Sequence, residues 1–301
     1  MNDKLKLIVV SGPTAIGKTE LSVLLARGFD CDIISADSRQ IYREMNIGTA
    51  KPSAQELEAA THYFINYKSI QDYYSAGRFE LDVIKLLSKY RKRAILMVGG
   101  SGLYIKAVCE GIDEFPGPDL MLRNVLQTRY KEKGLDPLRE ELRSLDYDTW
   151  KTIDLKNPKR VIRALEVIRQ TGKKYSVLKN ETHKNRDFDI LKIGLNIPRE
   201  DLIKRINLRV DGMLEAGLLE EVQSLLPFRN LTALQTVGYT EFFGYFDGEY
   251  DLEEAIRLCK RNSRRYAKRQ LTWFRKDEHI HWFSPNSYEQ IMTLITNFIT
   301  T

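Results

Sequence analysis

The sequence has little cysteine. Its three cysteines, Cys31, Cys109 and Cys259, are far apart in a chain of 301 residues, and no two form a CxxC pair. This spacing argues against a disulfide framework and against a zinc site, and it is typical of buried thiols in a reducing cytoplasm. The histidines are also too scattered to form a metal site, so we expect structural roles for His62, His183, His279 and His281.

Long apolar runs are absent as well. No run approaches the ~20 residues that a membrane span requires, so we expect no membrane association. The first four residues lead directly into a predicted strand, and we therefore expect no signal peptide. Internal repeats and low-complexity tracts are not visible either. The hydrophobic content of 43% and charged content of 29% instead indicate a globular protein, and the length allows a large core plus a smaller unit.

A phosphate-binding motif is the most specific pattern present. It has the form G-x-x-x-x-G-K-[ST], follows an apolar run, and consists of Gly12, Gly17, Lys18 and Thr19. The glycines of such a loop let backbone N–H groups surround an anion, while the lysine adds charge and the hydroxyl can bind Mg²⁺. A helix predicted at residues 20–27 adds the attraction of its N-terminus. The motif predicts a diphosphate site but leaves the diphosphate and the reaction open.

Apolar, β-rich runs alternate with helical spacing along most of the chain. The predicted strands are residues 6–10, 32–35, 94–98, 190–197 and 280–283. The alternation predicts an α/β fold, a P-loop NTPase-like core in which helices cover both faces of a parallel sheet. Ligands of such sheets bind at the carboxyl ends of the strands, so residues that follow three of these strands should converge on one crevice.

The alternation is interrupted in the middle of the chain. A breaker cluster at 115–118 is followed by helical spacing at 120–130, 137–145 and 158–170, without strand-like runs. We therefore predict a P-loop α/β core from residues 1–112 and 188–301, with an all-helical insertion domain at 113–187.

Asp37 follows the second predicted strand and would face the phosphate loop. Its carboxylate could help to hold Mg²⁺, could act as a general base on a bound acceptor, or could simply cap the turn. Its neighbours Ser38, Arg39 and Gln40 are polar, and an amide such as that of Gln40 is suited to reading adenine.

Two further sites could contact an anion. The glycine-rich segment 99–102 ends the third predicted strand and could approach a phosphate closely, although a plain strand-to-helix turn explains it equally well. Ser101 within it could donate a hydrogen bond to a leaving phosphate oxygen. Arg209 lies in an amphipathic helix, where it could pair with Asp211 or Glu215 or could clamp a diphosphate.

Positive charge is concentrated near the end of the chain. The net charge is +6, and residues 257–276 contain nine Lys/Arg and no Asp or Glu. One helix face would carry Arg257, Arg261, Arg264, Arg265 and Lys268. A solvated face is one explanation, but a run without any compensating acid fits better with a surface that binds phosphates.

In their order along the chain, these motifs resemble those of the tRNA dimethylallyltransferases, also called tRNA isopentenyltransferases. The resemblance spans residues 6–276 and rests on segments 12–19, 35–42, 48–52, 98–104, 160–167, 209–214, 237–239 and 264–274. No single segment is highly specific, but the combination is. Ser101 stands where the family more often has threonine, which preserves the hydroxyl.

The resemblance implies transfer of a dimethylallyl group from dimethylallyl diphosphate to N6 of the adenosine immediately 3′ of the anticodon. Lys18 and Arg209 would then neutralise the leaving pyrophosphate, Asp37 would accept the N6 proton, and Ser101 would lie at the reaction centre. Thr19 would help to position Mg²⁺. The donor diphosphate would be bound by Gly12, Pro13, Thr14, Ala15, Ile16, Gly17, Lys18 and Thr19.

The resemblance also implies tRNA as the second partner, with the adenosine extruded from the anticodon loop and the helical insertion contacting the anticodon stem-loop. Tyr239 and Phe242 could stack on bases, although core packing is the default for both. We expect a cytoplasmic monomer. The family's tRNA contacts correspond here to Asp37, Ser38, Arg39, Gln40, Ser101, Arg123, Arg160, Val161, Ile162, Arg163, Ala164, Gln235, Thr236, Val237, Gly238, Tyr239 and Thr240.

Two alternatives remain open at this point. An adenylate dimethylallyltransferase, which uses free AMP, ADP or ATP as acceptor, would share the phosphate loop and the base. It would need neither the basic helix nor the helical insertion. A nucleotide-driven RNA-binding module or a small-molecule kinase would need nucleoside triphosphate turnover, and residues 37–40 offer no acid dedicated to a Walker-type Mg²⁺ role.

Overall fold

The computed structural model describes residues 4–113, 115–179 and 184–301. Two expectations fall on residues outside these ranges. They are the structural role of His183 and the absence of a signal peptide, which is inferred in part from residues 1–3. The chain divides into two compact units, one formed by Met1–Glu110 with Asn185–Thr301 and the other by Gly111–Lys184. The second unit occupies nearly the same stretch of sequence as the insertion predicted at 113–187.

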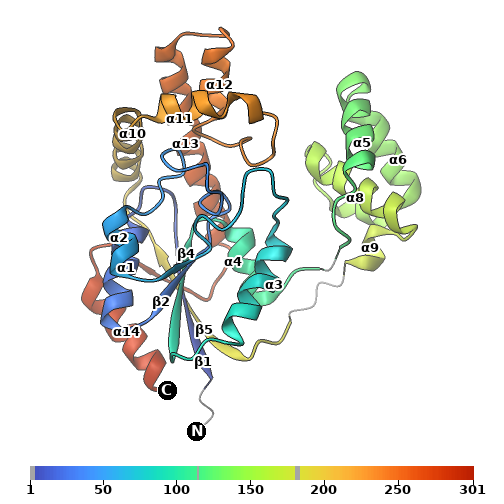
Figure 1. The fold of residues 1–301 in the computed structure, drawn as a ribbon. Coiled ribbons are helices and arrows are strands. Elements are labelled where there is room, and N and C mark those ends of the chain that lie inside the picture. The colour runs from blue at the N-terminus through green and yellow to red at the C-terminus, as the bar shows by residue number, and fades with distance from the viewer. Residues whose placement is uncertain (1–3, 114, 180–183) are drawn as a thin grey trace. The chain divides into compact units, whose positions relative to one another are not determined.

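The larger unit is built on a six-stranded parallel sheet with the strand order β3-β2-β4-β1-β5-β6 (Figure 1). Every residue of β4 and all but the first of β1 are buried, as expected for strands covered on both faces. The α/β prediction is confirmed, although β3 is too short to leave a sequence signal. The strands are β1 (Leu5–Ser11), β2 (Asp32–Ser35), β3 (His62–Tyr63), β4 (Ala94–Gly99), β5 (Phe188–Leu195) and β6 (Ile280–Phe283).

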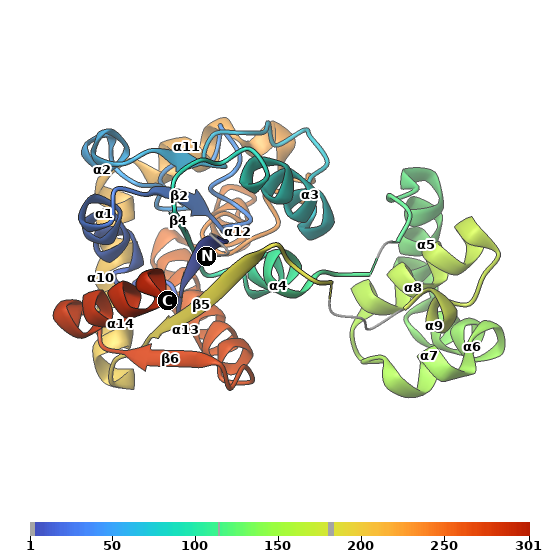
Figure 2. The ribbon, with the colours of Figure 1, turned by 90° about the horizontal axis from the view of Figure 1, so that it is seen from below.

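Helices cover both faces of this sheet. Figures 1 and 2 show α1 and α14 on one side of the sheet and α3 and α4 on the other. No helix in the described part of the chain is long and apolar enough to cross a membrane. The helices of this unit are α1 (Lys18–Gly28), α2 (Ala54–Ala59), α3 (Ala76–Leu87), α4 (Gly102–Glu110), α10 (Arg199–Glu215), α11 (Leu218–Ser224), the 3-10 helix η1 (Leu226–Phe228), α12 (Thr240–Phe246), α13 (Leu252–Phe274) and α14 (Tyr288–Thr300).

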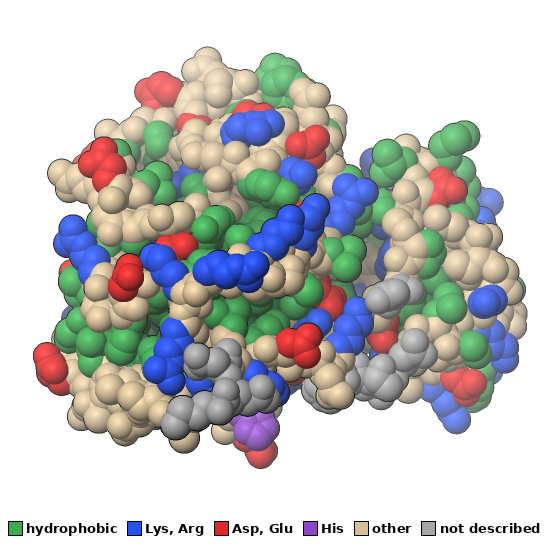
Figure 3. Space-filling view, turned by 60° about the horizontal axis from the view of Figure 1, so that its bottom comes forward, with side chains coloured by type: hydrophobic (Ala, Val, Ile, Leu, Met, Phe, Trp, Pro, Cys, Tyr) green, Lys and Arg blue, Asp and Glu red, His purple; other side chains and the backbone are tan. Residues whose placement is uncertain are grey.

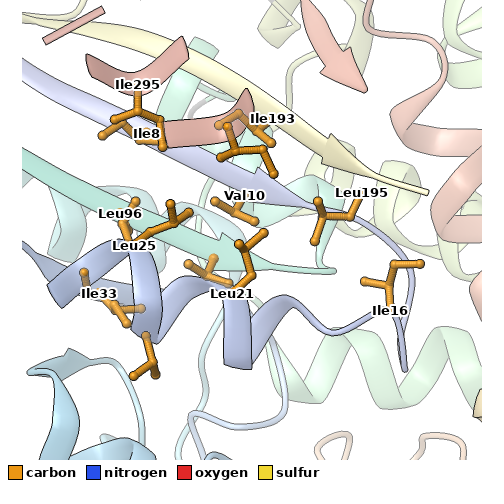
Figure 4. Packing of buried hydrophobic residues seen from close by; sticks show 14 of the residues in the cluster. Ile8, Val10, Ile16, Leu21, Leu25, Ile33, Leu96, Ile193, Leu195 and Ile295 are labelled. Carbon is orange, nitrogen blue, oxygen red and sulfur yellow. The ribbon is translucent and has the colours of Figure 1, made fainter. Parts of the chain in front are cut away.

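A continuous apolar core fixes the first strand against the first helix. Ile8 and Val10 of β1 pack with Leu21 and Leu25 of α1, and all four side chains are at most 4% exposed (Figure 4). Burying such side chains contributes about 1.5–3 kcal/mol each. Because both ends of the connection are held in this core, the phosphate-binding loop between β1 and α1 has a defined position.

The strand register brings the predicted site residues to one edge of the sheet. Ser11 at the end of β1 pairs with Gly99 of β4 and with Gly194 of β5. Ser35 at the end of β2 pairs with Val98 of β4. The segments that follow β1, β2 and β4 therefore begin at the same level, as the sequence predicted.

The smaller unit is helical throughout its described elements. It contains a core of its own, in which Leu126, Leu138, Leu142 and Leu165 are fully buried. Asn157 caps α8 by accepting hydrogen bonds from the N–H groups of the second and third helical residues, and Pro158 occupies the first position. The helices are α5 (Leu120–Lys133), α6 (Asp136–Leu145), α7 (Tyr147–Thr152), α8 (Pro158–Thr171) and α9 (Tyr175–Leu178).

Candidate active site

A cavity of about 320 Å³ opens at the carboxyl edge of the sheet. It is lined by the phosphate-binding loop, the turn after β2, the end of β4, and side chains of α10 and α13. Loops 48–50 and 236–238 complete the lining. Of the predicted site residues, the cavity brings together Thr14, Ala15, Ile16, Gly17, Lys18, Thr19, Asp37, Arg39, Gln40, Arg209, Thr236, Val237 and Gly238.

The phosphate-binding loop has the backbone geometry that its glycines permit. Gly12 and Gly17 have φ angles of +151° and +100°, which other residues rarely adopt. A Cβ on Gly12 would also lie only 3.0 Å from the carbonyl oxygen of Leu195. Gly17 is the N-cap of α1, whose first N–H groups have no partner within the helix. The loop therefore offers backbone donors and a helix N-terminus to an anion.

Lys18 is half-buried and is held against its own loop. Its Nζ donates hydrogen bonds to the carbonyl oxygens of Pro13 at 2.7 Å and Gly12 at 3.1 Å. Burial, with a smaller contribution from the positive charge of Arg209, lowers the pKa of Lys18 to about 7, and Asp37 partly opposes this shift. A bound diphosphate would favour the ammonium form, so binding and protonation of Lys18 should be coupled.

This coupling gives a pH-dependent prediction. At pH 8 most of the Lys18 side chains are neutral, and binding of inorganic pyrophosphate should raise their pKa and lead to the uptake of up to about one proton per site. Affinity should accordingly fall as the pH rises above about 7. Calorimetry in buffers of different ionisation enthalpy measures this uptake. Lys18→Arg, which stays charged, is the control for protons exchanged by pyrophosphate itself; equal uptake by both proteins would contradict the prediction.

Asp37 uses one carboxylate oxygen to shape its turn. Oδ1 accepts hydrogen bonds from the backbone N–H groups of Arg39 at 2.8 Å and Gln40 at 3.2 Å. The other oxygen has no hydrogen-bond partner among the described residues, and the side chain lines the cavity. The capping role considered from sequence is therefore present, but it leaves one oxygen for Mg²⁺ or for a proton.

Ser101 lies directly behind this turn. Its Oγ accepts a hydrogen bond from the N–H of Ser38 at 3.0 Å, so it joins the β4–α4 turn to the β2 turn. Tyr266 from α13 interacts with both Ser101 and Asp37. Burial raises the pKa of Tyr266 to about 12, so its hydroxyl is protonated at neutral pH.

The glycines around Ser101 serve close packing. A Cβ on Gly99 would lie 2.1 Å from the carbonyl oxygen of Ala36, and one on Gly100 would lie 2.1 Å from Nε2 of Gln270. A Cβ on Gly102 would lie 2.2 Å from Cδ1 of Trp273. These approaches explain the glycine-rich segment without an anion, and so favour the plain strand-to-helix turn.

Arg209 extends from α10 into the cavity. Among the described residues it has no carboxylate within ion-pairing distance, and Asp211 pairs with Lys260 at 2.6 Å instead. The surface pair with Asp211 considered from sequence is therefore wrong. Burial lowers the pKa of Arg209, while the nearby Asp37 opposes that shift. A cation held in this way is suited to an incoming anion.

The carboxamide of Gln40 is bonded within the chain. Its Nε2 donates to the carbonyl oxygens of Thr49 at 3.2 Å and Ala50 at 2.9 Å, and its Oε1 accepts from Ser35 Oγ at 3.1 Å. Any base contact through this amide would have to exchange these bonds. In the structure, Gln40 fixes the 49–50 segment of the cavity wall.

Helix α13 contributes a face to the cavity that the sequence analysis missed. The predicted basic face, from Arg257 to Lys268, lies mainly on the other side of this helix. From the sequence, Tyr266 looks like an ordinary packing residue. The spacing i, i+4, i+7, i+11 would have predicted one common face for Cys259, Ser263, Tyr266 and Gln270.

The positive charge of the 257–276 run is partly neutralised by residues outside it. Arg257 pairs with Glu254, Lys260 pairs with Asp211, and Arg264 donates a hydrogen bond to Asn207 Oδ1 at 2.7 Å. Arg265, Lys268 and Arg269 are exposed. Figure 3, which shows one face of the molecule, has Lys and Arg side chains interspersed with Asp and Glu. The charge available to a polyanion is therefore smaller than the sequence count suggests.

Several residues expected to contact tRNA are buried. Tyr239 and Phe242 are fully buried, so core packing explains both rings and neither can stack on a base in this conformation. Within the helical unit, the side chains of Val161, Ile162 and Ala164 belong to its core and are at most 6% exposed. In this conformation these side chains are not accessible to RNA.

Two predicted tRNA-binding arginines hold a buried acid. Arg123 donates to Oε2 of Glu166 at 2.8 and 3.1 Å, and Arg163 approaches the same oxygen at 3.2 Å. Glu166 is fully buried. Because an unpaired buried carboxylate is costly, both arginines have a structural role here. Arg160 and Gln235 are exposed, and Thr240 is half-buried.

Glu221 of α11 organises a wall of the cavity. Its Oε2 accepts hydrogen bonds from the N–H groups of Asn46 at 2.9 Å and Ile47 at 2.8 Å. Its Oε1 accepts from Gly48 N–H at 3.0 Å and from the Tyr239 hydroxyl at 2.6 Å. Four donors thus converge on one carboxylate and fix the loop that contributes residues 48–50 to the cavity.

We expect Glu221→Gln to destabilise the protein by about 2–3 kcal/mol, because an amide NH₂ would face donors that a carboxylate oxygen now accepts. Urea unfolding measures this change. Glu220→Gln makes the same substitution at the exposed neighbouring position and should change stability by less than about 0.5 kcal/mol. Similar unfolding midpoints for the two variants would show that the four bonds contribute little.

The fold and the cavity define a class of protein: a P-loop α/β enzyme in which a phosphate-binding loop and the Asp37 carboxylate line one cavity. The model of the family described as IPP transferase matches residues 40–277. The chain belongs to this family.

Relatives and solved structures agree with this assignment. The chain is 50% identical over 291 residues to a tRNA dimethylallyltransferase of Cytophaga hutchinsonii, covering 96% of each chain. It is 53% identical over 279 residues to that of Christiangramia forsetii, covering 92% of each. The tRNA isopentenylpyrophosphate transferase of Bacillus halodurans has a TM-score of 0.70 at 38% identity, over 99% of this chain and 96% of that one. A eukaryotic dimethylallyltransferase acting on tRNA has a TM-score of 0.82 at 26% identity, over 98% and 80%.

Proposed function

We propose that the protein transfers a dimethylallyl group from dimethylallyl diphosphate to N6 of the adenosine immediately 3′ of the anticodon in tRNA, releasing pyrophosphate. The observation that carries this proposal is the cavity in which the phosphate-binding loop, Arg209 and the free oxygen of Asp37 meet, in a chain about half identical to tRNA dimethylallyltransferases. The adenylate-using alternative finds no support among the relatives described above, which are named for tRNA.

The donor side needs to stabilise a leaving group. As the allylic C–O bond breaks, negative charge develops on pyrophosphate and positive charge spreads over the allylic carbons. The N–H groups of the loop, the ammonium of Lys18 and the guanidinium of Arg209 line the cavity and would bind that developing negative charge. Lys18 would exchange its loop carbonyl partners for diphosphate oxygens, which restores its charged form.

The acceptor side needs to remove a proton. The exocyclic N6 attacks the allylic carbon, and the proton that it then carries becomes acidic. Asp37 Oδ2 can accept this proton while Oδ1 continues to hold the turn. Ser101, at the junction of the two turns, would orient the reacting groups. Holding donor and acceptor in line supplies much of the acceleration.

Mg²⁺ fits this site only together with the donor. Within the described ranges, no group of three or more His, Cys, Asp and Glu residues could hold a metal. The Thr19 hydroxyl lines the cavity and supplies one oxygen. Mg²⁺ is commonly held by one or two protein oxygens plus phosphate oxygens, so diphosphate would complete the set and the ion would neutralise its charge.

Recognition of the tRNA would use both units of the chain. We infer that the helical unit binds the anticodon stem-loop through exposed groups such as Arg160, and that the exposed Arg265, Lys268 and Arg269 of α13 bind phosphates. Loop 236–238 would contact the extruded base at the cavity. We further infer a monomeric enzyme that acts in the cytoplasm, where tRNA is available.

One assay tests this function. The protein is incubated with Mg²⁺ and labelled dimethylallyl diphosphate, together with either tRNA or AMP. We expect label on tRNA, at the adenosine that follows the anticodon, and none on AMP. Label that appears only on AMP would identify the adenylate-using alternative. Release of phosphate from a nucleoside triphosphate, without prenylation, would indicate the kinase-like alternative.

A further inference from the structure

Gln270 connects two segments of the site that are remote in sequence. Its Oε1 accepts a hydrogen bond from the backbone N–H of Thr14 at 2.9 Å, in the phosphate-binding loop. Its Nε2 donates to the carbonyl oxygen of Gly100 at 3.0 Å, in the turn that carries Ser101. The side chain is only 6% exposed, so the carboxamide spans the two segments out of bulk water.

The surrounding structure packs closely against this side chain. A Cβ on Gly100 would lie 2.1 Å from Nε2 of Gln270, so glycine is required where the amide docks. Ala267 and Phe274 of α13, at 1% and 3% exposure, anchor the helix on either side. Gln270 therefore extends from a rigid element, and its position is set by packing rather than by solvent.

We propose that Gln270 is a positioning residue that holds the diphosphate-binding loop and the Ser101 turn at the separation needed for prenyl transfer. This inference rests on the proposed function. It assigns to α13 a task distinct from binding phosphates on its basic face. The carboxamide accepts the hydrogen bond of the Thr14 N–H and so fixes the backbone of the loop. Through Gly100, it holds Ser101 behind Asp37.

The chemistry of the amide determines the choice of residue. The carboxamide must accept from one backbone group and donate to the other. An ionised glutamate could accept from Thr14 N–H. Its second oxygen would then face the carbonyl oxygen of Gly100 without a proton between them, which is repulsive. A protonated glutamate would restore both bonds. Leucine can make neither, and asparagine is one methylene too short to reach both partners from the same helix.

The test compares Gln270→Leu and Gln270→Glu with the wild-type protein and with Gln223→Leu, a matched change at an exposed position on α11. Steady-state prenylation is measured with tRNA and dimethylallyl diphosphate, inorganic pyrophosphate affinity by calorimetry, and folding by thermal unfolding. We expect Gln270→Leu to lower kcat about tenfold to a hundredfold and to weaken pyrophosphate binding, with KM for tRNA changed less than about twofold.

The pH profile of Gln270→Glu separates positioning from general packing. Its activity relative to wild type should rise as the pH falls, whereas that of Gln270→Leu should stay constant. Taking the ratio at each pH cancels titrations common to the proteins. The titratable or charged groups that face the same cavity are Lys18, Glu20, Asp37, Arg39, Glu56, Arg209, Cys259 and Tyr266.

Two results would overturn the inference. The first is a Gln270→Leu protein with unchanged kcat and unchanged pyrophosphate affinity. The second is a loss of activity in Gln270→Leu that unfolding explains, together with a Gln270→Glu protein whose relative activity does not rise at low pH. If Gln270→Leu does not fold, Gln270→Glu decides alone. Failure of the proposed function would look different, because the wild-type protein would then not prenylate tRNA at all. The pyrophosphate measurements would still report whether Gln270 shapes the loop.

Discussion

Replacing Asp37 by asparagine should lower the rate of prenyl transfer by about three orders of magnitude while the protein remains folded. The asparagine carbonyl can still accept the hydrogen bonds that Oδ1 now receives from Arg39 and Gln40, so the turn survives. What is lost is the free carboxylate oxygen, which is proposed to accept the N6 proton. Single-turnover prenylation of tRNA with saturating donor measures this step.

A second substitution at the same position distinguishes chemistry from architecture. Asp37→Ala removes the turn-capping oxygen as well, and should therefore lose thermal stability in addition to activity. Asp201→Asn makes the conservative change at an exposed position of α10 and should leave both unchanged. Affinity for tRNA should be nearly the same in all these proteins. Weakened tRNA binding with normal turnover in Asp37→Asn would assign the carboxylate to recognition.

The sequence predicted the parts of this site that depend on local pattern. The glycines of the phosphate loop permit the positive φ angles that the loop requires. The apolar runs of β1, β2 and β4 determine which residues follow the strands at the edge of the sheet. Because parallel strands align their carboxyl ends, the pattern of strands and turns is enough to place Lys18 and Asp37 together. The same reasoning predicted the helical unit from breakers and helix starts.

Contacts between distant segments could not be predicted in this way. Gln270 binds Thr14 across 256 positions, and Glu221 binds the 46–48 loop across more than 170. No periodicity records such pairs, since each partner looks locally like an ordinary helix or loop residue. Charge counting failed at α13 for a related reason: Asp211 and Glu254, which neutralise part of its basic face, lie outside the run.

Arg209 illustrates how function can oppose stability. Among the described residues no carboxylate pairs with its guanidinium, and Arg209 lies near enough to Lys18 to help lower the pKa of that ammonium group. Bringing two cations together under partial burial is unfavourable in the free protein. The arrangement becomes favourable when a diphosphate enters, and more so as that diphosphate gains charge during bond cleavage.

Arg209→Gln should consequently lower kcat/KM for the donor by about 10²–10³-fold, while the thermal unfolding midpoint stays the same or rises. Arg209→Lys should recover only part of the rate, because an ammonium supplies the charge without the bidentate geometry of a guanidinium. The pKa of Lys18 should rise in Arg209→Gln, so proton uptake on pyrophosphate binding at pH 8 should shrink. Arg199→Gln, exposed on the same helix, is the control for an arginine lost from α10. Parallel losses of stability and activity in Arg209→Gln would instead indicate a structural arginine.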